Sequence, residues 1–229
     1  MNGDRAALPP GSWPWLHDLA RWLGSWIFLA PFRLRVRGRE RVPARGPIVV
    51  VANHSSLLDG PLVFAAVRRR RPVFLIKQEM FRGPLRWALP RIGQLAVRRG
   101  EPDRVPLLAA VRVLAAGGVV GVFPEGHRGA GDVAQAENGA AWLARSGHAV
   151  VLPVACRGTI RPTAPEKRFR RRVDVLVGEP FTVSAERGRA GLAAATEQVR
   201  GSLADLVGEL DRLRGNTSPP VSGVERVGE

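Results

Sequence analysis

The chain has little cysteine, little lysine and no tyrosine. Its one cysteine in 229 residues excludes an internal disulfide and favours a reducing compartment. That residue, Cys156, follows an apolar run over residues 150–155, where a small buried side chain is expected. The longest apolar stretch near the amino end, residues 22–32, is about half of the ~20 residues that a spanning helix needs. Residues 1–10 lack the layout of a secretory signal, so we expect neither a leader nor a membrane-spanning helix.

Acidic residues are scarce relative to basic ones. Lys and Arg number 35 against 20 Asp and Glu, which gives a formal net charge of +15. Such a charge favours a polyanionic partner, either nucleic acid, anionic lipid headgroups or a phosphorylated small substrate. Nucleic acid is disfavoured because tyrosine is absent, the aromatic residues do not interleave with the basic runs, and no nucleic-acid motif is present. A basic nucleic-acid or anionic-membrane binding protein without catalysis stays open as the alternative of another class.

The segment over residues 12–32 is rich in tryptophan and has the period of a helix. Four of the six tryptophans fall here, and tryptophan favours the boundary between lipid headgroups and acyl chains. We expect an amphipathic helix lying flat in one leaflet; packing on the protein's own core, or both contacts together, are the alternatives. Residues 33–42 then place arginine at every second position, which predicts a strand with one solvated face that could touch anionic lipid. The apolar positions of the helix are Leu16, Leu19, Ala20, Leu23, Trp26 and Ile27.

From residue 48 onward, strand-like and helix-like segments alternate. This order predicts a single α/β domain with a mixed, largely parallel sheet flanked by helices. We place a membrane-interface segment at residues 1–32, the domain that would carry a catalytic site at 33–214, and a disordered tail at 215–229. The expected strands are 48–52, 73–76, 94–97, 119–123, 150–155 and 173–177, and the expected helices are 57–67, 84–89, 104–115, 138–145 and 186–214.

A histidine and a carboxylate follow the end of the most apolar strand. Asn53 and His54 come directly after residues 48–52, and Asp59 lies five positions after His54, in the first turn of an expected helix. Ligands in open α/β sheets collect beyond the carboxyl ends of the strands, so the pair lies where catalysis is usual. A carboxylate that orients the imidazole would leave the second ring nitrogen available as a general base.

Two more clusters follow strand ends. Residues 123–129, Phe-Pro-Glu-Gly-His-Arg-Gly, predict a tight turn from which Arg128 could offer a fork to a phosphate. Residues 92–99 end a short apolar strand with Arg98 and Arg99. Three strand ends would thus supply one base and two cationic contacts.

At these residues the chain resembles the lysophospholipid acyltransferases of the glycerolipid pathway, the family typified by 1-acylglycerol-3-phosphate acyltransferase. The first family motif, Asn-His-four residues-Asp, is matched by Asn53, His54 and Asp59. The second, a glycine, an apolar run and an arginine, is similar to residues 93–99. The third, Phe-Pro-Glu-Gly-Thr-Arg-Ser, resembles residues 123–129, and the fourth, an apolar run around Pro-Val, resembles residues 151–154. The order and spacing of all four agree.

The resemblance implies transfer of a fatty acyl group from acyl-CoA or acyl carrier protein to the free hydroxyl of a lysophospholipid, above all 1-acyl-glycerol-3-phosphate. His54 would take the hydroxyl proton and Asp59 would orient the ring, with no cofactor beyond the donor substrate. Backbone amides near the start of the helix after Asn53 could stabilise the oxyanion. The implied location is the cytoplasmic face of the cell membrane, as a peripheral or monotopic protein on anionic lipid. The substrate-binding candidates are Asn53, Lys77, Arg98, Arg99, Glu125, Gly126, Arg128 and Pro153.

Two positions depart from the family pattern. His127 stands where threonine is usual and Gly129 where serine is usual, which removes a hydroxyl from the expected phosphate site. Another acceptor hydroxyl within the same family is therefore an alternative. A metal-dependent hydrolase with His54, Asp59, Glu125 and His127 as ligands is a further rival, but a pair five residues apart is not the helical spacing of familiar zinc sites. We expect no metal site.

Overall fold

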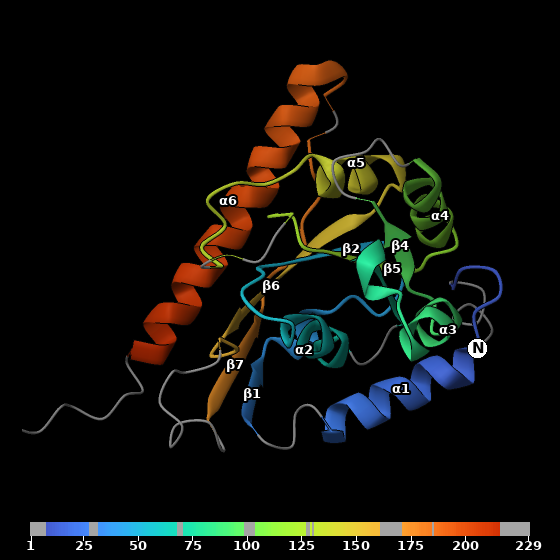
Figure 1. The fold of residues 1–229 in the computed structure, drawn as a ribbon. Coiled ribbons are helices and arrows are strands. Elements are labelled where there is room, and N and C mark those ends of the chain that lie inside the picture. The colour runs from blue at the N-terminus through green and yellow to red at the C-terminus, as the bar shows by residue number, and fades with distance from the viewer. Residues whose placement is uncertain are drawn as a thin grey trace, which may run out of the picture.

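The computed structural model describes residues 8–27, 32–67, 71–98, 104–126, 129, 131–160, 171–184 and 186–215. Its centre is a seven-stranded sheet in the order β1-β7-β6-β2-β5-β3-β4, in which every neighbouring pair is parallel except β6 with β7. The predicted α/β domain with a mixed, largely parallel sheet is confirmed (Figure 1). The strands are β1 (Arg33–Arg37), β2 (Ile48–Ala52), β3 (Pro72–Lys77), β4 (Leu95–Val97), β5 (Val119–Val122), β6 (Val150–Arg157) and β7 (Arg172–Val177). The α-helices are α1 (Pro14–Ile27), α2 (Asp59–Ala66), α3 (Pro84–Arg91), α4 (Arg104–Ala115), α5 (Gly139–Ser146) and α6 (Gly188–Gly215), and two 3₁₀ turns are η1 (Arg39–Arg41) and η2 (Gln78–Met80).

Strand β2 lies inside the sheet and is buried on both faces, as its unbroken apolar sequence predicts. Ile48 and Val50 pack with α2 on one face, whereas Val49 and Val51 pack with α4 and α5 on the other. Helix α6 covers that second face over β6 and β7 (Figure 1). Because β2, β3, β4 and β5 are parallel, their carboxyl ends meet at one edge of the sheet, where a site can form.

The edge strand β1 is shorter than the arginine alternation predicts. It ends at Arg37, and residues 39–41 form the 3₁₀ turn η1 instead of extending the strand to residue 42. The cause is Gly38, whose φ of 76° lies in the left-handed region and whose Cα approaches the Val177 carbonyl too closely for a side chain. Within β1 the arginines at alternate positions are exposed and the two apolar residues between them are partly buried.

Helix α1 packs on the domain through its polar side. His17 is fully buried, its Nε2 donates to the Pro72 carbonyl oxygen at 3.3 Å, and its ring lies 4.7 Å from that of Phe64 in α2. Asp18 accepts two hydrogen bonds from Arg71, at 2.7 and 3.2 Å. The opposite side of α1 therefore faces outward. Its exposed large apolar side chains are Trp15, Leu19, Trp22, Leu23 and Trp26.

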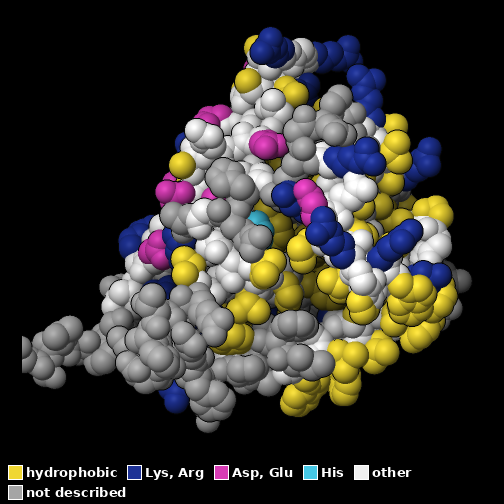
Figure 2. All heavy atoms as spheres, in the orientation of Figure 1, with side chains coloured by type: hydrophobic (Ala, Val, Ile, Leu, Met, Phe, Trp, Pro, Cys, Tyr) yellow, Lys and Arg dark blue, Asp and Glu magenta, His cyan; other side chains and the backbone are white. Residues whose placement is uncertain are grey.

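Helix α3 extends this outward apolar surface. Trp13, just before α1, meets the Trp87 ring of α3 edge to face at 5.7 Å, and the Arg91 guanidinium stacks over both rings. Trp87 and Leu85 are themselves exposed. Figure 2 shows hydrophobic side chains gathered at the lower right of the molecule, where Figure 1 places α1 and α3. We call the exposed apolar side chains of α1 and α3 the apolar face.

Candidate active site

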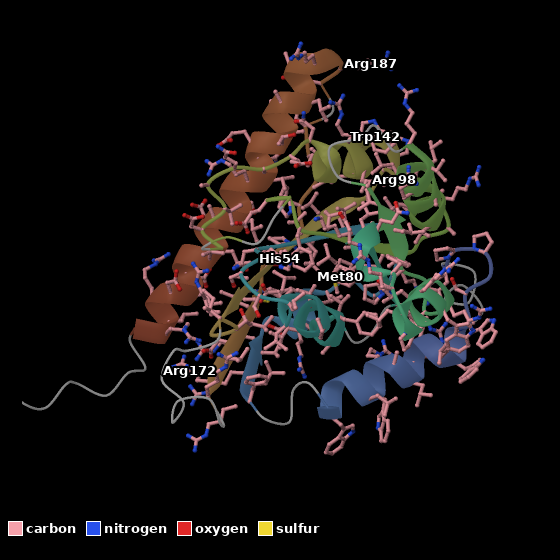
Figure 3. The ribbon with its side chains drawn as sticks, in the orientation of Figure 1. His54, Met80, Arg98, Trp142, Arg172 and Arg187 are labelled. Carbon is pink, nitrogen blue, oxygen red and sulfur yellow. The ribbon has the colours of Figure 1, made fainter. Side chains whose placement is uncertain are left out.

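The predicted histidine lies where the ends of β2 and β5 meet. The two strands pair in parallel, so the residues after β2 and the Phe-Pro-Glu-Gly segment after β5 reach the same edge. The His54 backbone N–H donates to Glu125 Oε1 at 2.7 Å, and the His54 carbonyl accepts from the Gly129 N–H at 3.0 Å. Two segments about 70 residues apart are thereby joined at His54, the predicted general base, which Figure 3 labels near the middle of the molecule.

Asp59 orients the imidazole as the motif predicts. His54 Nδ1 lies 3.3 Å from Asp59 Oδ2, so we assign the ring proton to Nδ1, which leaves Nε2 as the basic nitrogen. The same carboxylate oxygen accepts the backbone N–H groups of Ser55 and Ser56 at 2.7 and 2.6 Å. Asp59 is fully buried in the first turn of α2, where the helix dipole also favours its negative charge. This geometry is the one that a general base and its orienting carboxylate would need.

The expected oxyanion donors are in part engaged elsewhere. The Ser55 and Ser56 amides, which lie between Asn53 and the start of α2, both donate to Asp59. The Leu58 amide donates to Ser56 Oγ at 3.3 Å. The hydrogen bonds of these amides therefore stabilise the turn between β2 and α2.

Phe123 lies against one face of the His54 imidazole. Its ring stacks on the His54 imidazole with centroids 4.2 Å apart and an interplanar angle of 24°. Asp59 holds one edge of the imidazole and Phe123 covers one face. The sequence alone indicates no role for this phenylalanine, although it stands directly before the Pro-Glu-Gly turn.

Asn53 ties the end of β2 to β6. Its side-chain nitrogen donates to the carbonyl oxygens of Gly131 and Cys156 at 3.2 and 3.0 Å, and its oxygen accepts the Cys156 N–H at 2.7 Å. The amide is buried and its hydrogen-bonding groups are used by the backbone. Its architectural role is therefore clear, and its contact with a substrate stays a prediction.

The Pro-Glu-Gly turn is shaped by close backbone packing. Glu125 is mostly buried, and one of its oxygens holds the His54 amide. Gly126 has a φ of 69°, and an added Cβ would lie 2.5 Å from Glu137 Oε1. The Glu137 N–H donates to the Pro124 carbonyl at 2.8 Å. The turn that contains Glu125 and Gly126 thus contacts the His54 backbone, and its contact with a substrate stays a prediction.

Two predicted cations are found at the same sheet edge. Lys77 ends β3 and its Nζ lies 3.3 Å from Glu79 Oε1. Arg98 follows β4, is exposed, and donates from Nε to Gln78 Oε1 at 2.6 Å. Strands β3 and β4 pair in parallel with Lys77 opposite Val97, so both side chains arise from adjacent strand ends. Arg99, Arg128 and His127 lie outside the described residues.

Pro153 is not brought to the site. It lies inside β6 opposite Val51, two residues short of the level of Asn53, and its side chain is buried. Its ring packs against Gly178, where an added Cβ would lie 2.8 Å away. The apolar run that suggested a substrate contact is instead the interior of a strand, so Pro153 serves the core of the sheet.

A second set of contacts, which the sequence did not predict, holds the segment at Gly131 in place beside Asn53. Arg157 donates from Nη1 to the Gly131 carbonyl at 2.8 Å and forms a two-pronged ion pair with Asp211 of α6 at 2.8 and 2.9 Å. Gly131 has a φ of 68°, and an added Cβ would lie 2.8 Å from the Asn53 side-chain nitrogen. These partners are separated by tens of residues in the chain, so no local sequence pattern predicts their contacts.

A hollow lined by hydrophobic side chains lies beside the histidine. Figure 2, in the orientation in which Figure 3 labels His54, shows a histidine side chain at the margin of this hollow, with basic and acidic side chains around its upper rim. The described residues contain no group of three or more His, Cys, Asp or Glu side chains that could hold a metal ion. None of the described helices is long and apolar enough to cross a membrane.

Fold and site together define an α/β enzyme with a histidine–carboxylate pair at the carboxyl edge of parallel strands. The sequence model of the Acyltransferase family matches residues 33–157, more than half of the chain. The chain belongs to this family and is an acyltransferase.

Similar proteins agree with this assignment. The 1-acyl-sn-glycerol-3-phosphate acyltransferase of Bacillus subtilis is 27% identical over 191 residues, which cover 79% of this chain and 91% of that protein. The enzyme of the same name from Borreliella burgdorferi is 28% identical over 137 residues, 58% of this chain and 54% of that protein. The crystal structure of the 1-acyl-sn-glycerophosphate (LPA) acyltransferase PlsC from Thermotoga maritima is alike in fold, with a TM-score of 0.64 and 23% identity over 89% of this chain and 80% of that one.

Proposed function

We propose that the protein transfers a fatty acyl group from acyl-CoA or acyl carrier protein to the free hydroxyl of 1-acyl-glycerol-3-phosphate, giving phosphatidic acid. The observation that carries the proposal is the His54–Asp59 pair beside a hydrophobic hollow at the carboxyl edge of the sheet. The name of the Bacillus subtilis relative, whose length this chain nearly covers, supports the choice of acceptor.

In the proposed reaction, His54 acts on the acceptor hydroxyl. Nε2 removes the hydroxyl proton as the oxygen attacks the carbonyl carbon of the thioester, so that a C–O bond forms and the C–S bond then breaks. The imidazolium, stabilised by Asp59, returns the proton to the departing thiolate. The ester and the thiol are the only products, and no acyl-enzyme is formed.

The acceptor phosphate is proposed to bind the cations at the sheet edge. Lys77 and Arg98 stand on adjacent strand ends, and Arg99 and Arg128 follow in the two motif segments. Guanidinium groups suit phosphate because they offer two parallel donors. Asn53, Glu125 and Gly126 would shape the acceptor site around the reacting hydroxyl.

We also propose that the protein works on the surface of a membrane that contains anionic lipid, at its cytoplasmic face. The apolar face points away from the domain, and α1 holds the domain by its polar side, which is the arrangement an interfacial helix needs. Just after this helix, β1 presents exposed arginines at alternate positions. Tryptophan supplies the interfacial contact and arginine the attraction to anionic headgroups.

The substrate assignment is tested by offering purified protein a panel of acceptors with acyl-CoA and, separately, acyl carrier protein. The panel contains 1-acyl-glycerol-3-phosphate, lysophospholipids with choline or ethanolamine headgroups, and glycerol-3-phosphate. Mass spectrometry is expected to find phosphatidic acid, formed together with one equivalent of thiol. A different favoured acceptor would overturn the headgroup, and thioester hydrolysis without any ester product would overturn acyl transfer to a lipid.

A further inference from the structure

A continuous line of aromatic rings joins α1 to the catalytic histidine. The His17 ring lies 4.7 Å from Phe64, Phe64 lies 6.4 Å from Phe74, Phe74 lies 6.0 Å from Phe123, and Phe123 lies 4.2 Å from His54. Each centroid distance is within or below the range of about 4.5–7 Å over which rings interact favourably. The five rings come from α1, α2, β3 and the segments after β5 and β2.

The middle of this line is rigidly placed. Phe74 is almost fully buried, and its ring fills the space over Gly121 of β5, where an added Cβ would clash with it. The Phe74 N–H donates to Oε1 of the buried Gln94 at 2.8 Å. Because a close-packed ring in this position has no space to move into, displacement at one end of the line is passed on rather than absorbed.

The α1 end of the line is fastened to the start of β3. His17 bonds to the carbonyl of Pro72, two residues before Phe74, and Asp18 pairs with Arg71. We call these contacts of His17 and Asp18 the α1 seat. The α1 seat contacts Arg71 and Pro72 at the start of β3, and the aromatic line passes through Phe74 two residues later.

The other end of the line acts on the ring that takes up a proton. Asp59 restrains one edge of the His54 imidazole but leaves rotation about that hydrogen bond possible, whereas the stacked Phe123 ring restrains its plane. Once protonated, the imidazole is a cation over the face of an aromatic ring, an attractive arrangement. Phe123 thus favours the orientation in which His54 Nε2 faces the acceptor hydroxyl, and it also stabilises the protonated imidazolium.

We propose that Phe123 is a positioning residue for His54, and that Phe74 and Phe64 extend this positioning to the α1 seat. The way α1 is held on the domain then sets the orientation of the catalytic ring, so the helix with the outward apolar face is part of the support of the active site. The inference rests on the proposed role of His54 as general base. Spatial contact alone does not establish coupling, so the test reads the His54 ring directly.

The readout is the set of histidine ring signals in NMR of protein labelled with ¹⁵N-histidine. The chain has four histidines, so His54→Gln identifies the His54 signals by their loss. The test variants are Phe123→Leu, next to His54, and Phe64→Leu, which lies two rings beyond Phe123 in the line. The matched control is Phe181→Leu, because Phe181 packs in the core cluster on the opposite face of the sheet. All three changes remove the same atoms.

Both test variants are expected to shift the His54 ring signals and to lower kcat, by about tenfold for Phe123→Leu, near the upper end of what one aromatic pair contributes. The KM for the acyl donor should stay within about twofold, as suits a residue acting through His54. Phe181→Leu should leave both the His54 signals and kcat unchanged.

Unchanged His54 signals in a folded Phe64→Leu protein would overturn the link to α1, and unchanged signals in Phe123→Leu would overturn the positioning role. Circular dichroism checks folding, and Phe64→Met, which nearly preserves volume, replaces Phe64→Leu if that variant is unfolded. If His54→Gln kept wild-type turnover, the proposed role of His54 as general base would fail, yet the ring signals of the phenylalanine variants would still report on the aromatic line.

Discussion

At the scale of single residues, the parts of the site that are contiguous in sequence were predictable. His54 and Asp59 are five residues apart, and the helix that follows β2 brings the carboxylate to the ring. The stacking of Phe123 on His54 and the contact of Gly131 with Asn53 were not predictable, because they depend on how β5 and β6 lie beside β2. A short motif determines chemistry, whereas the sheet determines what surrounds it.

Gly131 gives a prediction at this scale. Gly131→Ala is expected to lower the free energy of unfolding by about 2–3 kcal/mol, because its left-handed backbone strains an L-residue and the new Cβ meets the Asn53 side chain. Gly46→Ala is the control, since its φ of 85° carries the same strain with nothing within 4 Å, and should cost only about 1 kcal/mol. Urea unfolding measures both, and equal losses would show that the contact with Asn53 is immaterial.

At the scale of elements, periodicity predicted the helix at α1 but not the side by which it packs. The same apolar stripe fits a helix on a core and a helix on a lipid surface, and the structure exposes Leu19, Leu23 and Trp26 of that stripe. The deciding contacts are the Pro72 carbonyl and Arg71, which lie more than 50 residues away in sequence. Strand β1 also ends earlier than its sequence predicts because of a contact that is distant in sequence, that of Gly38 with β7.

The α1 seat predicts a pH dependence. Burial lowers the pKa of His17 from 6.5 to about 4; the hydrogen bond to Pro72 opposes this, and the nearby Arg21 adds to it. Between pH 6.5 and 4 the unfolded chain binds a proton at this residue that the native protein does not, so the free energy of unfolding falls as pH falls, by about 3 kcal/mol over the window.

The check is urea unfolding of wild type and His17→Gln across that range. Glutamine can still donate to the Pro72 carbonyl but does not titrate, so the variant should lose less stability on acidification. Asp18, whose pKa the Arg71 hydrogen bond lowers, titrates in both proteins and cancels in the comparison. Identical pH dependence in the two proteins would mean that His17 is not held neutral in the native state.

At the scale of the whole molecule, alternating strands and helices were enough to predict the α/β class. They did not predict the strand order, in particular that β7 runs antiparallel to β6 and that the early strand β1 pairs beside β7. Strand order is set by how connections cross the sheet, which local sequence does not encode. The net charge of +15 predicted an anionic partner, and the apolar face is the basis on which we propose a lipid surface in particular.

Vesicle binding tests this view of the molecule. The protein is expected to sediment with vesicles that contain anionic lipid, less with zwitterionic vesicles, and less again as salt rises, because exposed charges are screened. Replacing Trp22 and Trp26 by glutamine should weaken binding at least about tenfold, whereas Leu108→Gln on α4, a similarly exposed apolar residue, should not. Equal losses of vesicle binding in the two variants would show that the apolar face does not bind the membrane.

The most direct measurement is the kcat of His54→Gln with 1-acyl-glycerol-3-phosphate and an acyl thioester, beside that of His148→Asn. His148 is exposed, lies just before β6 at the opposite edge of the sheet, and has a φ of 46° that asparagine tolerates. The account predicts that His54→Gln loses about 100-fold or more in kcat, as the loss of a general base should, while His148→Asn stays at the wild-type rate. Wild-type turnover by folded His54→Gln would contradict the assignment of His54 as the base.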